Sequence, residues 1–451
     1  MTITFYGGAE SVTGSNYLLQ VGDLKILVDC GLFQGSSDAE MKNYEPFPYK
    51  PEEIKAVFIT HSHADHTGRL PKLFKEGFRG IVYATPPTLE MTAIALPDNL
   101  GLMTDEAKHE SHPPLFSMAD LDGLMNLTQG MAYGQEIDLG SGVVAVLHEA
   151  GHILGSSIVE IRAEGKKIYF SGDLGNPPTP LLRPFEYPVD ADYIVVESAY
   201  GNRIHEDRSQ RKEKLRSIVK DTIDRGGVLM IPSFAMERTQ ELLFELEEMH
   251  KSGEIPEVPI FLDSPLAIKL TEVYQNYPDF FNKEAKYIVD SGSDLFNFAG
   301  LKYTRTAQES KSINDVPQPK IIIAGSGMSA GGRILHHERR YLSDSNSTLL
   351  FIGYQAEGTP GRKILEGAKD IKIFDELVPV NCRIEAIGGY SAHADQPTLL
   401  KWLAKGAEGT HLKKVFTVQG EVTSATELAQ LITKNLGVEA VVPAPDQAIE
   451  L

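Results

Sequence analysis

The sequence predicts an α/β fold, and three features of the chain support that class. Residues 1–199 contain short apolar runs that end at polar residues, such as KILVD (25–29) and KAVFIT (55–60), as buried strands do. From about residue 205 helical stretches alternate with apolar strands, which is typical of a parallel sheet covered by helices. Strands with polar turns return near the C-terminus. We therefore expect an α/β body (1–199 and 373–451) that is interrupted by an inserted α/β domain (200–372).

Composition limits the class of protein further. The 451 residues are 42% hydrophobic and 23% charged, as in ordinary globular domains. Two cysteines, Cys30 and Cys382, cannot form a disulfide framework and suit a reducing cytoplasm. We expect no signal peptide and no membrane span. The net charge of −19 argues against a broad basic surface, although metal cations in a cleft can still attract a phosphate.

The motif HSHADH (61–66) is the strongest chemical signal in the chain. It follows the predicted strand KAVFIT, so His61, His63, Asp65 and His66 are expected on a loop at the strand's end. Imidazole and carboxylate groups bind Zn²⁺ and similar metals, and four such ligands exceed what one tetrahedral ion with an open position needs. The spacing suits two neighbouring ions, the first bound by His61 and His63 and the second by Asp65 and His66.

Two other strand ends offer further ligands. His152 lies in GHILG, and Asp173 in FSGDLG could bridge the two ions. His148 is a weaker candidate because it lies earlier in its strand. Asp29 ends another strand and could orient a ligating histidine. Together these residues resemble the metallo-β-lactamase fold, a four-layer αββα sandwich with a binuclear metal site, which hosts hydrolases of several classes.

The rest of the chain carries a second set of motifs. They are ESAYGNR (197–203), IPSFAMERTQELL (231–243), LDSPLA (262–267), GSGMSAGGR (325–333), GYQAEGT (353–359) and GGYSAHADQ (388–396). These motifs resemble the β-CASP branch of that superfamily, and specifically its RNA-cleaving members. The resemblance implies two zinc ions, single-stranded RNA held between the two domains, and hydrolysis that leaves a 5′-phosphate and a 3′-hydroxyl. It also allows a homodimer, and both endonuclease and exonuclease activity.

The same resemblance assigns catalytic and RNA-binding residues. Asp65, Glu197 and His393 are the candidate catalytic residues, with His393 protonating the leaving oxygen and Glu197 orienting its imidazole. A structural salt bridge between Glu197 and His393 is the alternative interpretation. The candidate phosphate contacts are Ser326, Gly327, Met328, Arg333 and Ser391, with His336 and His337 as further possibilities beside the glycine-rich loop.

One position departs from the family pattern. RNA-cleaving relatives usually end a late strand with V-H-G-E, whose histidine binds the second ion, whereas this chain has Gln419 in VFTVQGE (415–421). An amide oxygen is a poorer ligand than imidazole for a borderline metal, so we expect the second ion to bind weakly or to be Mn²⁺. The chain could be an active ribonuclease, an RNA-binding relative with impaired catalysis, or an enzyme inactivated by this one change. A small-molecule hydrolase is disfavoured by the long inserted domain.

Overall fold

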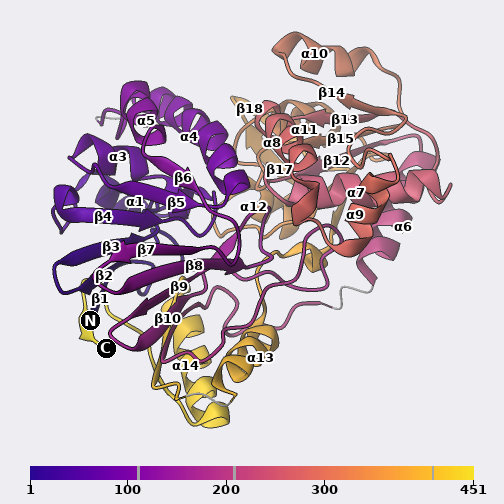
Figure 1. Cartoon of the computed structure of the whole chain (residues 1–451). Coiled ribbons are helices and arrows are strands. Elements are labelled where there is room, and N and C mark those ends of the chain that lie inside the picture. Colours follow the sequence, from indigo (N-terminus) through magenta and orange to yellow (C-terminus); the bar gives the residue numbers. More distant parts are fainter. Residues whose placement is uncertain (109–111, 207–209, 409–410) are drawn as a thin grey trace. The chain divides into compact units, whose positions relative to one another are not determined.

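Residues 1–204 and 393–451 form one unit of the structure (unit 1), and residues 205–392 form the other (unit 2). The computed structural model describes residues 1–108, 112–206, 210–408 and 411–451 (Figure 1). Each unit is built around its own β-sheets, as the interrupted α/β pattern of the sequence predicts.

Unit 1 contains two seven-stranded sheets. The first has the order β22-β1-β2-β3-β4-β5-β6, with β3 to β6 parallel. Its strands are β1 (Thr2–Gly7), β2 (Asn16–Val21), β3 (Leu24–Val28), β4 (Ile54–Phe58), β5 (Ile81–Ala84), β6 (Thr128–Gly130) and β22 (Ala448–Glu450). The second has the order β21-β20-β11-β10-β9-β8-β7, with β10, β11, β20 and β21 parallel. Its strands are β7 (Glu136–Gly140), β8 (Val143–Glu149), β9 (Ser157–Ala163), β10 (Lys166–Phe170), β11 (Tyr193–Glu197), β20 (Lys414–Val418) and β21 (Glu439–Val441).

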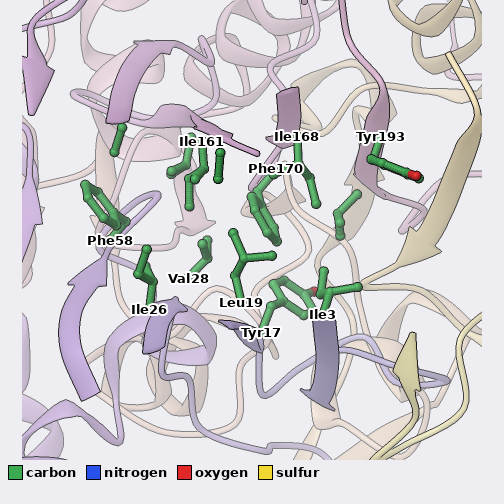
Figure 2. Packing of buried hydrophobic residues seen from close by; sticks show 14 of the residues in the cluster. Ile3, Tyr17, Leu19, Ile26, Val28, Phe58, Ile161, Ile168, Phe170 and Tyr193 are labelled. Carbon is green, nitrogen blue, oxygen red and sulfur yellow. The ribbon is translucent and has the colours of Figure 1, made fainter. Parts of the chain in front are cut away.

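The two sheets pack face to face, and their inward side chains form one core (Figure 2). Strand β2 shows why the sequence folds this way. Tyr17 and Leu19 point into the layer between the sheets, while Leu18 packs in the separate cluster on the outer face. This alternation is the period of two that a strand imposes on its side chains. Burying a side chain such as Phe58 or Phe170 contributes roughly 2 kcal/mol.

Helices cover the outer face of each sheet. The first sheet is covered by α3 (Leu70–Lys75), α4 (Pro86–Glu106) and α5 (Met118–Met125), and the second by α13 (Gln396–Ala407) and α14 (Val422–Leu436). Two short helices, α1 (Ser37–Met41) and α2 (Ala64–Thr67), lie in the connections. Unit 1 is therefore the expected αββα sandwich.

Unit 2 has one parallel six-stranded sheet of order β14-β13-β15-β12-β16-β19. Its strands are β12 (Val228–Pro232), β13 (Ile260–Asp263), β14 (Leu301–Tyr303), β15 (Lys320–Ala324), β16 (Thr348–Phe351) and β19 (Arg383–Ala386). Its helices are α6 (Arg211–Asp224), α7 (Arg238–Lys251), α8 (Pro265–Asn276), α9 (Lys283–Asp290), α10 (Ala307–Ser312), α11 (Ile334–Tyr341) and α12 (Pro360–Leu365). Strands β17 (Asp370–Ile373) and β18 (Glu376–Pro379) pair as a separate antiparallel hairpin. Because β19 belongs to this sheet, the sheet continues beyond residue 372, where the sequence placed the end of the inserted domain.

None of the helices in the described ranges combines the length and the hydropathy that a membrane crossing requires.

Candidate metal centre

The polar residues singled out in the sequence lie where parallel strands of unit 1 end. Asp29 follows β3, and the histidine motif follows β4, its direct neighbour. In the second sheet Asp173 follows β10, Glu197 ends β11 and Gln419 follows β20, and these three strands are neighbours. The carboxyl ends of neighbouring parallel strands meet at one edge of a sheet, which is where α/β proteins bind ligands.

Four side chains form what we call the first cluster: His61, His63, His152 and Asp173. One ligand atom from each lies within 4.8 Å of all the others. His63 Nδ1 is 3.0 Å from His61 Nε2 and 3.4 Å from His152 Nε2. The Oδ2 atom of Asp173 is 3.4 Å from His61 Nε2 and 3.6 Å from His152 Nε2.

The spacing and the protonation of these groups fit a metal ion. Ligand atoms that lie about 2.1 Å from a tetrahedral ion are about 3.4 Å apart, close to the separations in the first cluster. Burial lowers the pKa of His61, and lowers the pKa values of His63 and His152 further, so the imidazoles are neutral with a free lone pair. Three neutral imidazole nitrogens beside one carboxylate are a donor set suited to Zn²⁺.

A second cluster adjoins the first and comprises Asp65, His66, Asp173 and Gln419. His66 Nε2 is 3.6 Å from Asp65 Oδ2 and 3.5 Å from Asp173 Oδ1. The amide nitrogen of Gln419 is 3.1 Å from His66 Nε2 and 3.5 Å from Asp65 Oδ2. Asp173 thus presents Oδ2 to the first cluster and Oδ1 to the second, which is the placement a bridging ligand needs.

Asp29 fixes the orientation of His66. Its Oδ2 lies 2.7 Å from His66 Nδ1, so the imidazole donates the Nδ1 proton there and keeps Nε2 for the second cluster. Asp29 is itself held by Thr60, whose N–H donates to Oδ1 at 2.8 Å and whose hydroxyl donates to Oδ2 at 2.9 Å. We did not predict Thr60, although its position directly before the histidine motif could have suggested it.

Both Asp29 and Gln419 adopt left-handed backbone conformations, with φ of 62° and 49°. Such conformations are unfavourable for residues other than glycine and are concentrated at functional sites. Both residues follow strands, and both side chains contact His66.

Glu197 and His393 lie beside the first cluster. Their side chains meet at 2.9 Å between Glu197 Oε2 and His393 Nδ1, and the backbone N–H of Leu174 donates to the other carboxylate oxygen. His393 Nδ1 is also 3.8 Å from Asp173 Oδ2. Burial raises the pKa of Glu197 to about 6, while His393 opposes that rise. The His393 imidazole is 30% exposed, so a substrate that arrives from solvent can contact it.

His148 lies outside both clusters. Its Nε2 is 2.8 Å from Glu160 and its Nδ1 is 3.2 Å from Glu186, so both ring nitrogens have carboxylate partners. These carboxylates raise the pKa of His148 to about 9 against the opposing effect of burial. It is held as an ion pair, unlike the histidines of the first cluster.

All the predicted phosphate contacts belong to unit 2. Ser326, Gly327 and Met328 occupy the loop between β15 and α11, and Ser391 is half-buried just after a short helix at 388–390. Among the described residues the N–H groups of Gly327 and Met328 donate no hydrogen bond, so they remain candidates for binding an anion.

Arg333 and His337 both contact Asp263 in the structure. Arg333 donates to Asp263 Oδ1 at 2.7 Å and to the carbonyl of Thr304 at 2.8 Å. The buried His337 contacts Asp263 Oδ2 at 2.7 Å. These contacts within unit 2 favour a structural role for the two residues, and a phosphate contact by Arg333, whose side chain is 20% exposed, stays a prediction. His336 is exposed, with its ring 4.9 Å from that of Phe374.

Three family models match the chain in succession. Residues 18–174 match a metallo-beta-lactamase superfamily domain, residues 239–364 a Beta-Casp domain, and residues 377–443 a Zn-dependent metallo-hydrolase RNA specificity domain. A solved structure of a protein of unknown function from Enterococcus faecalis has a TM-score of 0.58 at 12% identity, covering 100% of this chain and 99% of its own, and supports the fold alone.

Two curated relatives match over nearly the whole chain. Ribonuclease TTHA0252 of Thermus thermophilus is 38% identical over 432 residues, which are 96% of each chain. Transcription termination factor FttA of Methanosarcina mazei is 32% identical over 97% of this chain and 69% of its own length. With the binding geometry described above, these matches show that the chain belongs to the β-CASP family of metallo-β-lactamase-fold hydrolases, whose relatives include ribonucleases.

Proposed function

We propose that the chain is a metal-dependent ribonuclease that hydrolyses phosphodiester bonds of single-stranded RNA. The first cluster is the observation that carries the proposal, because three neutral imidazoles and a carboxylate converge there within 4.8 Å of one another. The similarity to Ribonuclease TTHA0252 over 96% of both chains supports RNA as the substrate.

The metal ligands that we propose are His61, His63, His152 and Asp173 for the first ion and Asp65, His66, Asp173 and Gln419 for the second. Bound divalent ions would neutralise the charge of the phosphate and lower the pKa of the attacking water. Zn²⁺ suits the first cluster, whereas the two carboxylates and the amide of the second favour a metal that accepts oxygen ligands, such as Mn²⁺.

The protein's own groups would move the protons. Asp65, partly exposed beside the second cluster, is placed to accept a proton from the attacking water. The water oxygen bonds to phosphorus as the bond from phosphorus to the 3′ oxygen breaks. His393, oriented by Glu197, delivers a proton to that oxygen. The products would be a 3′-hydroxyl and a 5′-phosphate, and the resemblance to RNA-cleaving β-CASP members leads us to expect cuts within the RNA as well as from an end.

A second candidate function rests on Gln419. If the amide does not hold the second ion, the chain binds RNA without turnover, as an impaired relative or an enzyme inactivated at this position. Gln419 is the one predicted ligand position at which this chain departs from the RNA-cleaving relatives. Because the first cluster is intact, we favour the active enzyme.

The test is cleavage of single-stranded RNA by the full chain, with the RNA labelled at either end and Zn²⁺ or Mn²⁺ supplied. We expect cleavage that a chelator abolishes and that His63→Ala removes. His148→Ala is the matched control, because this histidine belongs to unit 1 but is bound by Glu160 and Glu186. Enzymatic extension of the 3′ ends would show whether they carry a free hydroxyl.

Chelator-insensitive cleavage, or cleavage that survives in His63→Ala, would contradict the proposal. RNA binding without turnover in both the parent and Gln419→His would favour the second candidate function.

A further inference from the structure

Asp173, Glu197 and His393 form a further group of possible metal ligands in unit 1, which we call the third cluster. One ligand atom from each of the three residues lies within 4.8 Å of the other two. His393 Nδ1 is 2.9 Å from Glu197 Oε2 and 3.8 Å from Asp173 Oδ2. The proposed function gives Glu197 and His393 only the movement of a proton, yet the same atoms face one another as metal ligands do.

The spacing of the third cluster fits a divalent ion. Ligand atoms that lie about 2.1 Å from one ion are between about 3.0 Å and 4.2 Å apart, depending on the angle between them. The two separations measured from His393 Nδ1 lie in or next to this range. The backbone N–H of Leu174 binds the other oxygen of Glu197 and so keeps Oε2 directed at His393. One imidazole nitrogen with two carboxylate oxygens is a donor set that suits Zn²⁺.

The charge of the third cluster also favours a cation. Asp173 and Glu197 are 3% and 0% exposed, and both carboxylates face the same imidazole nitrogen. The proton that Nδ1 donates to Glu197 does not serve Asp173, because 3.8 Å is beyond hydrogen-bond distance. A divalent ion in place of that proton contacts both carboxylates and brings one more positive charge to a buried acidic pair.

Access and composition place the third cluster after the first in affinity. The His393 imidazole is 30% exposed, which gives an ion a path from solvent to the two buried carboxylates. The third cluster has one imidazole where the first has three, and it shares Asp173 Oδ2 with the first. Its imidazole must also release a proton before it can bind an ion. We therefore expect the third cluster to fill only at a higher zinc concentration.

We propose that the third cluster is an inhibitory Zn²⁺ site, which fills when zinc exceeds what the other two clusters bind. The inference rests on the proposed function, because the ion takes the residues that would deliver the proton. It bonds to the lone pair of His393 Nδ1, and the proton that this nitrogen held goes to solvent. The imidazole then keeps only its Nε2 proton, and in this form it is a much weaker acid than imidazolium. General acid catalysis typically contributes about 10²–10⁴-fold to a rate, and that contribution is lost.

The test counts zinc bound to the full chain without RNA, by equilibrium dialysis against a series of buffered free Zn²⁺ concentrations. We expect the parent to take up a further ion after the more tightly bound zinc. His393→Ala should lose that uptake, Glu197→Gln should shift it to higher free zinc, and the matched control His148→Ala should keep it. RNA cleavage by the parent should fall about a hundredfold or more as the further ion binds. Excess Mn²⁺ should cause no such fall, because it binds imidazole less tightly than Zn²⁺ does.

The tightly bound zinc serves as the internal control for folding, because Glu197→Gln and His393→Ala leave the histidines of the first cluster in place. Uptake of the further ion that is equal in the parent and in both variants would overturn the inference. RNA cleavage that stays constant while the parent binds this ion would overturn it as well. If the parent binds zinc but cleaves no RNA at any zinc concentration, the proposed function fails, and the dialysis comparison alone decides whether the third cluster binds Zn²⁺.

Discussion

Unit 1 and unit 2 each bury a group of histidine and aspartate side chains, but the two groups are satisfied differently. In unit 2 all the acceptor sites of Asp263 are used. Oδ1 accepts from Thr304 and Arg333, and Oδ2 contacts Ser310 and His337, each at 2.7 Å. Burial alone would raise the pKa of Asp263, but these donors hold it at about 2.

The first cluster of unit 1 has no such complement of donors. Its three imidazoles face one another with lowered pKa values, and His152 Nδ1 has no partner within the described residues. A complete hydrogen-bonded set has no place for a further ligand, whereas three neutral imidazoles that converge on one carboxylate can take up a cation. Hydrogen-bond completeness therefore separates a structural cluster from a metal site, even where the residue types are the same.

Removal of a first-cluster ligand should have the largest effect. We expect His63→Ala to lower RNA cleavage about a thousandfold or more, because a bound ion contributes several kcal/mol to transition-state stabilisation. Elemental analysis should show a loss of metal, while the thermal midpoint of the metal-free protein changes little. A variant that keeps its metal and its activity would remove His63 from the site.

The hydrogen-bonded group around Asp263 in unit 2 should respond in the opposite way, with a loss of stability and no loss of metal. Asp263→Asn removes the counter-charge of Arg333 and replaces the carboxylate that the buried His337 contacts, and we expect the free energy of unfolding to fall by about 3–5 kcal/mol. Metal content per folded chain should not change. Denaturant unfolding with parallel elemental analysis checks both points, and a loss of metal would show that the two clusters are not independent.

A third kind of buried carboxyl occurs next to the glycine-rich loop. Glu338 contacts the Ser329 hydroxyl through one oxygen, its other oxygen has no partner among the described residues, and burial raises its pKa to about 8. Between pH 4.5 and 8 the unfolded chain ionises this group while the folded chain keeps it protonated, so folding stability falls as the pH rises.

Glu338→Gln should remove that dependence. The variant should gain stability relative to the parent as the pH rises from 5 to 8, by up to a few kcal/mol at about 1.4 kcal/mol per pKa unit. Unfolding curves at several pH values measure the difference. A constant difference across this range would mean that Glu338 is ionised in the folded protein.

Gln419→His should give the smallest change, a gain in the second cluster. Imidazole is a better ligand than an amide for Zn²⁺, so we expect the affinity for the second ion to rise by about tenfold, or 1.4 kcal/mol. Competition with a metal-chelating dye measures that affinity. Weaker binding in the variant would mean that the second cluster is shaped for the amide.

Local patterns in the sequence predicted the α/β body of unit 1 and the parallel sheet of unit 2, because strand periodicity and the alternation of helix and strand depend on neighbouring residues. The layers of unit 1 were expected only from the family resemblance. HSHADH also predicted four candidate metal ligands, since they lie within six residues. Asp29, His152 and Asp173 were candidates because each lies at a strand end, but sequence spacing alone does not show which strand ends meet.

The sequence could not show how polar groups pair across the fold. Arg333 and His337 follow a glycine-rich loop and suggested phosphate contacts, but their partner Asp263 lies about 70 residues earlier.

The most direct test of the account is the metal content of the purified chain, measured by elemental analysis after equilibration with Zn²⁺ and Mn²⁺ and removal of free ions. We predict two ions per chain in the parent, a loss of the first-cluster ion in His63→Ala, and two ions in His148→Ala. Absence of bound metal in the parent, or equal metal content in all three proteins, would contradict the claim that the converging histidines and aspartates of unit 1 form a metal centre.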